Sequence, residues 1–144
     1  MFANLDIAAS GLSAQRLRLD IIANNLANAE TTRTAAGGPY RRRLPVFAPR
    51  EATSFQYFFQ AAAEGGVGRG VRVTGIVTDP SPLRRVYQPG HPDADAAGYV
   101  AYPNVNVVTE MVDMISASRA YEANAAAFNA GKGMALEALE LGRR

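Results

Sequence analysis

The chain has 144 residues, enough for one domain, and its 48 % hydrophobic and 19 % charged residues are typical of a folded protein. Its formal net charge of +2 is too small to indicate nucleic-acid binding by itself. The absence of cysteine excludes disulfide bonds and thiolate metal sites. The first residues lack a basic segment followed by a long apolar one, so we expect no cleaved secretory signal. No stretch reaches the roughly 18 apolar residues of a membrane span.

The first region, residues 1–30, is predicted to be an N-terminal helix with a coiled-coil stripe. Leucine recurs every seven residues, and smaller or polar residues occupy the positions between, as in the a and d sites of heptads. Gly11 and three asparagines weaken the helix, so we expect it to need a partner. The stripe consists of Leu5, Ala8, Leu12, Gln15, Leu19, Ile22, Leu26 and Ala29.

The middle region, residues 31–103, contains all eight prolines and is predicted to be a small β-rich domain. Clusters of proline, glycine and aspartate separate its strands. Residues 49–68 are predicted to be flexible, with a short helix or mobile loop over Glu51–Glu64. The expected strands are Tyr40–Val46, Val71–Val77, Arg84–Tyr87 and Tyr99–Tyr102.

The third region, residues 104–144, repeats apolar positions in steps of three and four and predicts a C-terminal coiled-coil helix. The expected fold is therefore mainly α with a small β insert, and the two terminal helices pair as a coiled coil. Each helix carries more apolar surface than one partner covers, although a simple intramolecular hairpin stays an alternative. The seam consists of Met111, Met114, Ser118, Tyr121, Ala125, Phe128, Lys132, Ala135 and Leu139, widened by Ile115 and Leu136.

No group of residues predicts an enzyme, a metal site or a cofactor. His91 is the only histidine and lies in a turn near Asp93 and Asp95, without the spacing of a metal or general-base site. No serine has the Gly-x-Ser-x-Gly context of a nucleophile elbow. The glycine-rich run 65–70 precedes a strand and lacks the Gly-Lys-Ser/Thr of a phosphate loop, so it is interpreted as a hinge.

Arg41, Arg42 and Arg43 form the densest basic cluster. Together with Tyr40 they could contact phosphates and stack on a base, but three arginines alone are weak evidence for nucleic-acid binding. On an edge strand they would instead discourage unwanted pairing. A third interpretation is polar contact with an acidic neighbouring subunit.

Two separate motifs, one near each terminus, resemble the signatures of the flagellar basal-body rod protein family. The first comprises Gly11–Gln15 and Leu19–Asn28, and the second comprises Asn104–Ile115 and Arg119–Asn124. The Thr-Pro-Gly-Tyr type of turn is replaced by Glu30–Thr34, which is more similar to proximal-rod members. The motif residues are Gly11, Asn24, Asn25, Asn28, Asn104, Asn106, Glu110, Arg119, Tyr121 and Asn124.

This resemblance implies a structural subunit that is exported without a cleaved signal peptide through the flagellar type III apparatus and assembles in the periplasm. The implied partners are copies of the chain and other rod proteins, with the MS-ring and export-gate side and the distal rod as neighbours, and neither nucleic acid nor membrane. A soluble coiled-coil adaptor and a nucleic-acid-binding β-module stay alternatives. The residues expected at subunit interfaces are Leu5, Leu12, Leu19, Ile22, Leu26, Met111, Met114, Ile115, Tyr121, Ala125, Phe128 and Leu139.

Overall fold

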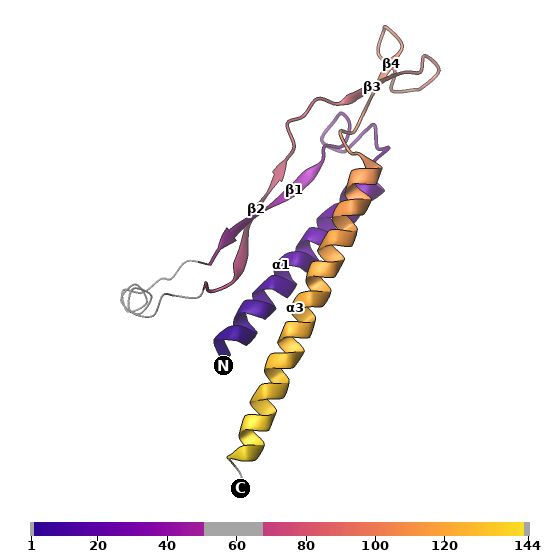
Figure 1. Ribbon diagram of the computed structural model, residues 1–144. Helices are drawn as coiled ribbons and strands as arrows, with labels where there is room; N and C mark the ends of the chain where they lie inside the picture. The colour runs from indigo at the N-terminus through magenta and orange to yellow at the C-terminus, as the bar shows by residue number, and fades with distance from the viewer. Residues whose placement is uncertain (1, 51–67, 143–144) are drawn as a thin grey trace. The chain divides into compact units, whose positions relative to one another are not determined.

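The computed structural model describes residues 2–50 and 68–142, and within them it confirms two terminal helices with short strands between them. The predicted helix or loop over Glu51–Glu64 lies outside the described residues. Figure 1 shows the order of the elements along the chain. They are α1 (Phe2–Ala27), β1 (Arg43–Pro49), β2 (Val71–Thr78), β3 (Arg84–Tyr87), β4 (Tyr99–Tyr102) and α3 (Val107–Leu141).

The chain divides into two compact units, and both long helices contribute to each of them. The first unit contains Met1–Leu17, Val46–Gly75 and Ser118–Arg144, and the second contains Arg18–Pro45 and Ile76–Ala117. Each unit therefore pairs one part of α1 with one part of α3. Among the described residues, no helix is long and apolar enough to cross a membrane.

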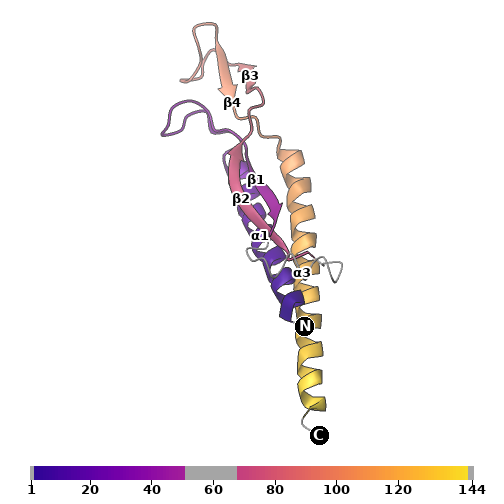
Figure 2. The same cartoon turned by 90° about the vertical axis from the view of Figure 1, so that its left-hand side faces the viewer.

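In the first unit, small residues bring α1 and α3 close together, and the two helices lie side by side in both views (Figures 1 and 2). A Cβ atom added to Gly11 would lie 2.7 Å from Oδ1 of Asn124, and one added to Gly131 would lie 3.0 Å from Cδ2 of Leu5. Ala8 and Ala14 are buried beside them. The helices thus run antiparallel and approach each other where side chains are smallest.

The strands β1 and β2 form a two-stranded sheet. The second half of β1, from Val46, and the first half of β2, up to Gly75, belong to the first unit. The amide of Arg50 donates to the carbonyl oxygen of Gly70 at 3.0 Å. Gly70 has a φ of 94°, and a side chain there would overlap the hydroxyl of Ser10. That hydroxyl accepts a hydrogen bond from the amide of Val71 at 3.1 Å, so the sheet is attached to α1 by a backbone contact that only glycine permits.

In the second unit, β3 and β4 form a separate antiparallel pair, with Arg84 opposite Tyr102 and Tyr87 opposite Tyr99. The four described strands therefore make two ribbons and not one small sheet. The rings of Tyr87 and Tyr99 meet edge to face, with their centroids 5.3 Å apart. Gly98 lies beneath Tyr87, where an added Cβ would come within 2.8 Å of the ring.

Two asparagines define the helix ends in the second unit. The side-chain oxygen of Asn106 accepts hydrogen bonds from the amides of Val108 at 3.0 Å and Thr109 at 3.3 Å, which is the geometry of an N-cap for α3. At the end of α1, the side chain of Asn28 donates to the carbonyl oxygen of Asn24 at 2.9 Å. This contact satisfies a carbonyl of the last helical turn, and the helix ends three residues before the predicted boundary at Glu30.

Candidate assembly site

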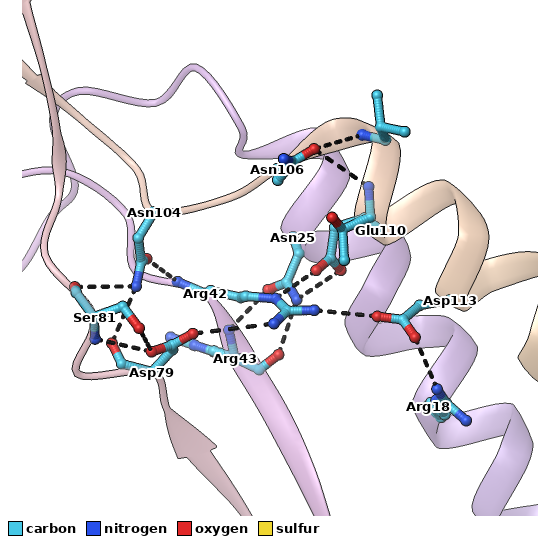
Figure 3. A network of polar contacts seen from close by, with 12 residues as sticks. Arg18, Asn25, Arg42, Arg43, Asp79, Ser81, Asn104, Asn106, Glu110 and Asp113 are labelled. Carbon is cyan, nitrogen blue, oxygen red and sulfur yellow. Dashed lines mark hydrogen bonds and ion pairs between the residues drawn. The ribbon is translucent and has the colours of Figure 1, made fainter.

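Arg42 lies at the centre of a network of polar contacts in the second unit (Figure 3). Its Nε donates to Oε1 of Glu110 at 2.5 Å, and its Nη2 donates to Oδ2 of Asp113 at 3.2 Å. Asp113 also receives a hydrogen bond from Arg18 at 3.1 Å. The Glu110 carboxylate is fully buried, and such a charge is tolerated only because an opposite charge and hydrogen bonds accompany it.

Asn25 on α1 links the helix pair to the start of β1. Its Oδ1 accepts a hydrogen bond from the amide of Arg43 at 2.9 Å, while its Nδ2 donates to the carbonyl oxygen of the same residue at 2.8 Å. The Nδ2 also donates to Oε2 of Glu110 at 3.1 Å. One buried amide thus contacts both α3 and the backbone that enters β1.

Asn104, just before α3, binds the backbone of Arg42, next to the residue that Asn25 holds. Its Oδ1 accepts from the amide of Arg42 at 2.9 Å, and its Nδ2 donates to the carbonyl oxygen of Asp79 at 3.2 Å. The side chain and the backbone amide of Ser81 donate to the Asp79 carboxylate and lower its pKa. We call this network the polar clasp; it comprises Arg18, Asn25, Arg42, Asp79, Asn104, Glu110 and Asp113.

Tyr40 is buried and contacts the clasp at Asn25. Its hydroxyl lies 2.9 Å from Oδ1 of Asn25 and 3.0 Å from Oδ1 of Asn24. Burial raises the pKa of this phenol, and the positive charge of Arg43 partly offsets that effect. Residues 40–42 are held by these side-chain contacts, which explains why β1 begins at Arg43 and not at Tyr40 as predicted.

The stripe predicted on α1 lies largely against other parts of the chain. Ile22 is buried, and the leucines at positions 5, 12, 19 and 26 are half-buried. The seam predicted on α3 is only partly covered by other parts of the chain. Met114, Ala125 and Phe128 are half-buried, whereas Met111, Ile115, Tyr121 and Leu139 are exposed. Whether any of these residues contacts another subunit stays a prediction.

The motif residues also occupy distinct places. Gly11 and Asn124 face each other in the first unit, while Arg119 and Tyr121 are exposed on α3. The others gather in the second unit at the clasp or at the helix ends beside it, namely Asn24, Asn25, Asn28, Asn104, Asn106 and Glu110.

The arginine cluster does not act as one surface. Arg42 is paired within the chain, whereas Arg41 and Arg43 are exposed. The guanidinium of Arg43 lies over the Tyr40 ring at 5.8 Å from its centroid. His91 accepts a hydrogen bond from the amide of Asp93 at 3.1 Å, so its ring nitrogen stabilises the turn in which it lies.

Sequence reasoning missed the charged side chains that complete the clasp. Arg18, Asp79 and Asp113 come from separate segments, and only folding brings them together with Arg42. A signal was present in α3, where Glu110 and Asp113 interrupt an apolar run at helical spacing. Only the burial of Ala117 on the same face, seen in the structure, shows that the two carboxylates point inward.

Two known protein families match the chain, one at each end. Residues 5–33 match the family described as flagella basal body rod protein, and residues 96–141 match the family described as flagellar basal body rod FlgEFG protein C-terminal. These matches cover most of α1 and all of α3. The class is therefore that of the rod proteins of the flagellar basal body, which are structural proteins.

Relatives that match nearly the whole chain show which family of rod proteins it belongs to. The chain is 50 % identical to the flagellar basal-body rod protein FlgC of Borreliella burgdorferi, over 98 % of this chain and 97 % of that protein. It is 45 % identical to FlgC of Bacillus subtilis over 99 % and 98 % of the two chains. It is 44 % identical to FlgC of Escherichia coli O157:H7 over 96 % and 95 %. The chain belongs to the FlgC family of flagellar basal-body rod proteins.

Proposed function

We propose that this chain is a structural subunit of the proximal part of the flagellar rod and that it assembles through faces of its terminal helices that its own fold leaves uncovered. The observation that carries this proposal is an apolar surface on the first turns of α3. Four large side chains, which we call the outward stripe, are exposed there: Val108 at 70 %, Met111 at 52 %, Val112 at 62 % and Ile115 at 55 %.

The outward stripe lies on one side of the helix because its positions follow the spacing of three and four residues. A contiguous apolar surface exposed to water favours association with another molecule. Since the family consists of rod proteins, the occupant we propose is a helix of a neighbouring subunit, either a copy of this chain or a relative.

The last turns of α3 offer a second such surface in the first unit. Beyond Gly131, which packs against Leu5 near the start of α1, the large apolar residues are exposed. A helix that continues past its partner presents these side chains to a further subunit. They are Met134, Leu136, Leu139 and Leu141.

The finer features of the proposal follow from the family. We propose that the paired helices act as a coiled coil and that the chain divides functionally into residues 1–30, 31–103 and 104–144. Its assembly would place it in the periplasm, after type III export without a cleaved signal peptide, where the rod transmits torque to the hook. The proposed neighbours are other rod proteins, on the MS-ring and export-gate side and on the distal-rod side.

Polar contacts between subunits are proposed for Arg41 and Arg43, because both are exposed. Arg42 is a weaker candidate, since its guanidinium is already paired with Glu110 and Asp113. A charge reversal at Arg41 that leaves assembly intact would exclude that residue from the interface.

The test is complementation of a clean deletion strain, scored by swimming and by electron microscopy of basal bodies. The deletion strain should lack rods and hooks, and the wild-type chain should restore them. Val112→Asp and Ile115→Asp should fail to restore rods, because each places a charge in the outward stripe. Thr109→Asp is the matched control, since it adds the same charge at an exposed position on another side of α3. Normal rods in the deletion strain would contradict the proposed function and favour a soluble adaptor.

A further inference from the structure

The first turns of α3 have an inverted distribution of polarity. Glu110 and Ala117, on the side that faces the rest of the chain, are both 0 % exposed, and the charged Asp113 lies between them. The large apolar residues of the outward stripe lie on the opposite side of the same turns. Helices of globular proteins normally bury the apolar side, so something other than apolar burial holds α3 in this rotation.

The polar clasp supplies the contacts that hold it. Figure 3 shows Glu110 and Asp113 directed towards Arg42, while Asn25 reaches Glu110 from α1. A rotation of α3 about its axis would break all of these hydrogen bonds and leave Arg42 without the carboxylate that accompanies it. Directional bonds of this kind distinguish one rotation from another, which apolar contacts do much less strictly.

Without the clasp, a rotated α3 would be favoured by the hydrophobic effect. The buried face of α1 in this unit contains Ile21 and Ile22, and apolar residues of α3 could pack against them. Such a rotation would bury the outward stripe inside the chain and close the surface that assembly uses.

We infer that the polar clasp is a positioning device that fixes the rotation of α3 and so prevents the chain from burying its own assembly surface. This inference rests on the proposed function only in what it says about assembly. Arg42 and Glu110 are the central positioning residues, and they act through the orientation of the outward stripe without touching a partner themselves.

The rotation of α3 can be measured with single cysteines, because the chain has none of its own. Cysteine is placed at Val112, on the outward stripe, or at Ala117, on the buried side, and each chain must keep the circular dichroism of its parent. With the clasp intact, Cys at 112 should react with a thiol reagent at least about tenfold faster than Cys at 117.

The same pair of cysteines is then placed in an Arg42→Met/Glu110→Leu chain. Removing both charges leaves no unpaired partner in the central ion pair, and Asp113 keeps Arg18. We expect helical content to persist while the ratio of the two labelling rates falls to within about threefold. Arg41→Met is the matched control, because this exposed neighbour donates to the carbonyl oxygen of Ser81 and not to the carboxylates of α3, and it should leave the ratio unchanged.

Two results would overturn the inference. An unchanged ratio in the double variant would show that other contacts fix the rotation. Loss of helical content, with both cysteines reacting at the rate of an unfolded chain, would show that the clasp is simply a source of stability. Glu110→Gln separates these cases further, since a glutamine keeps the shape and the acceptor oxygen and should reduce the ratio without unfolding the chain.

Complementation separates this inference from the proposed function. If wild-type chain restores rods and the double variant restores far fewer, both stand. If the double variant restores as many rods as wild type, the inference fails and the proposed function stands. If the deletion strain already makes normal rods, the proposed function fails, and the labelling ratio still decides whether the clasp fixes the rotation of α3.

Discussion

Asn25 and Glu110 join the two long helices through a buried hydrogen bond of 3.1 Å between an amide and a carboxylate. The two residues are 85 positions apart in the sequence, and each also contacts the segment that contains Arg42 and Arg43. One pair of side chains thus connects α1, α3 and the entry to β1.

Removing the carboxylate should destabilise the fold strongly. Glu110→Ala leaves the guanidinium of Arg42 without its buried partner, and we expect a loss of about 3 to 5 kcal/mol in the free energy of unfolding. Urea denaturation of the purified chain measures this loss. Asp113→Ala is the control, because Arg42 keeps Glu110 and the site is more exposed, so about 1 kcal/mol is expected. Equal losses in the two variants would contradict the central role of Glu110.

The close approach of the helices at Gly11 predicts a clash that a second substitution relieves. Gly11→Ala should stabilise the helix itself by about 1 kcal/mol. The new Cβ, however, would lie 2.7 Å from the side chain of Asn124. We expect a net fall in melting temperature, and recovery in Gly11→Ala/Asn124→Ala. Gly133→Ala is the matched control, since nothing lies near its Cβ, and it should stabilise the chain. A single Gly11→Ala variant as stable as wild type would show that the side chain of Asn124 turns away, giving up its hydrogen bond to Ala120, at little cost.

Removing the N-cap of α3 should cost less stability, and the change should be confined to the first turn of the helix. Asn106→Ala removes the acceptor for the amides of Val108 and Thr109 and should cost about 1 kcal/mol. Asn106→Asp keeps an acceptor in the same place and should retain the wild-type stability. Hydrogen exchange at the two amides should increase in the alanine variant. Unchanged exchange there would mean that the side chain of Asn106 does not protect these two amides.

Acid titration should reveal the hydrogen bonds between Ser81 and Asp79. These bonds hold the pKa of Asp79 below its ordinary value of 3.8. A depressed pKa adds stability that is present above the unfolded pKa and is lost as the pH falls through the folded one. Ser81→Ala should raise the pKa of Asp79 towards 3.8, as measured by NMR of its carboxyl carbon. An unmoved pKa would assign the shift to the remaining causes, which are the backbone amide of residue 81 and the charges of Arg42 and Arg41.

Much of the secondary structure could be predicted, because helical periodicity and turn residues are local signals. The two helices and the strands β3 and β4 follow the predicted segments closely. The strand β1 begins three residues late, since the contacts of Tyr40 and Arg42 with distant side chains replace strand pairing at its start. The separation of the strands into two ribbons likewise depends on contacts that no local pattern shows.

The rotation of α3 could not be predicted, because heptad spacing favours the largest apolar residues as the buried seam. In the second unit the buried side instead carries Glu110 and Ala117, and Met111 and Ile115 lie outside it. This choice depends on Arg42, which is 68 positions before Glu110 and reaches it only in the folded chain. A pattern within one helix contains no information about such a partner.

Arg43 contributes only its backbone amide and carbonyl to Asn25, and this has a consequence for how the sequence can vary. A backbone contact is the same for almost every residue type, so this contact to α1 would persist with another side chain at position 43, whereas the contact of the Arg43 guanidinium with the Tyr40 ring would be lost. Proline is the exception, because it has no N–H to donate. Position 25 has the opposite character, since a single amide group makes every bond there and few other side chains could take its place.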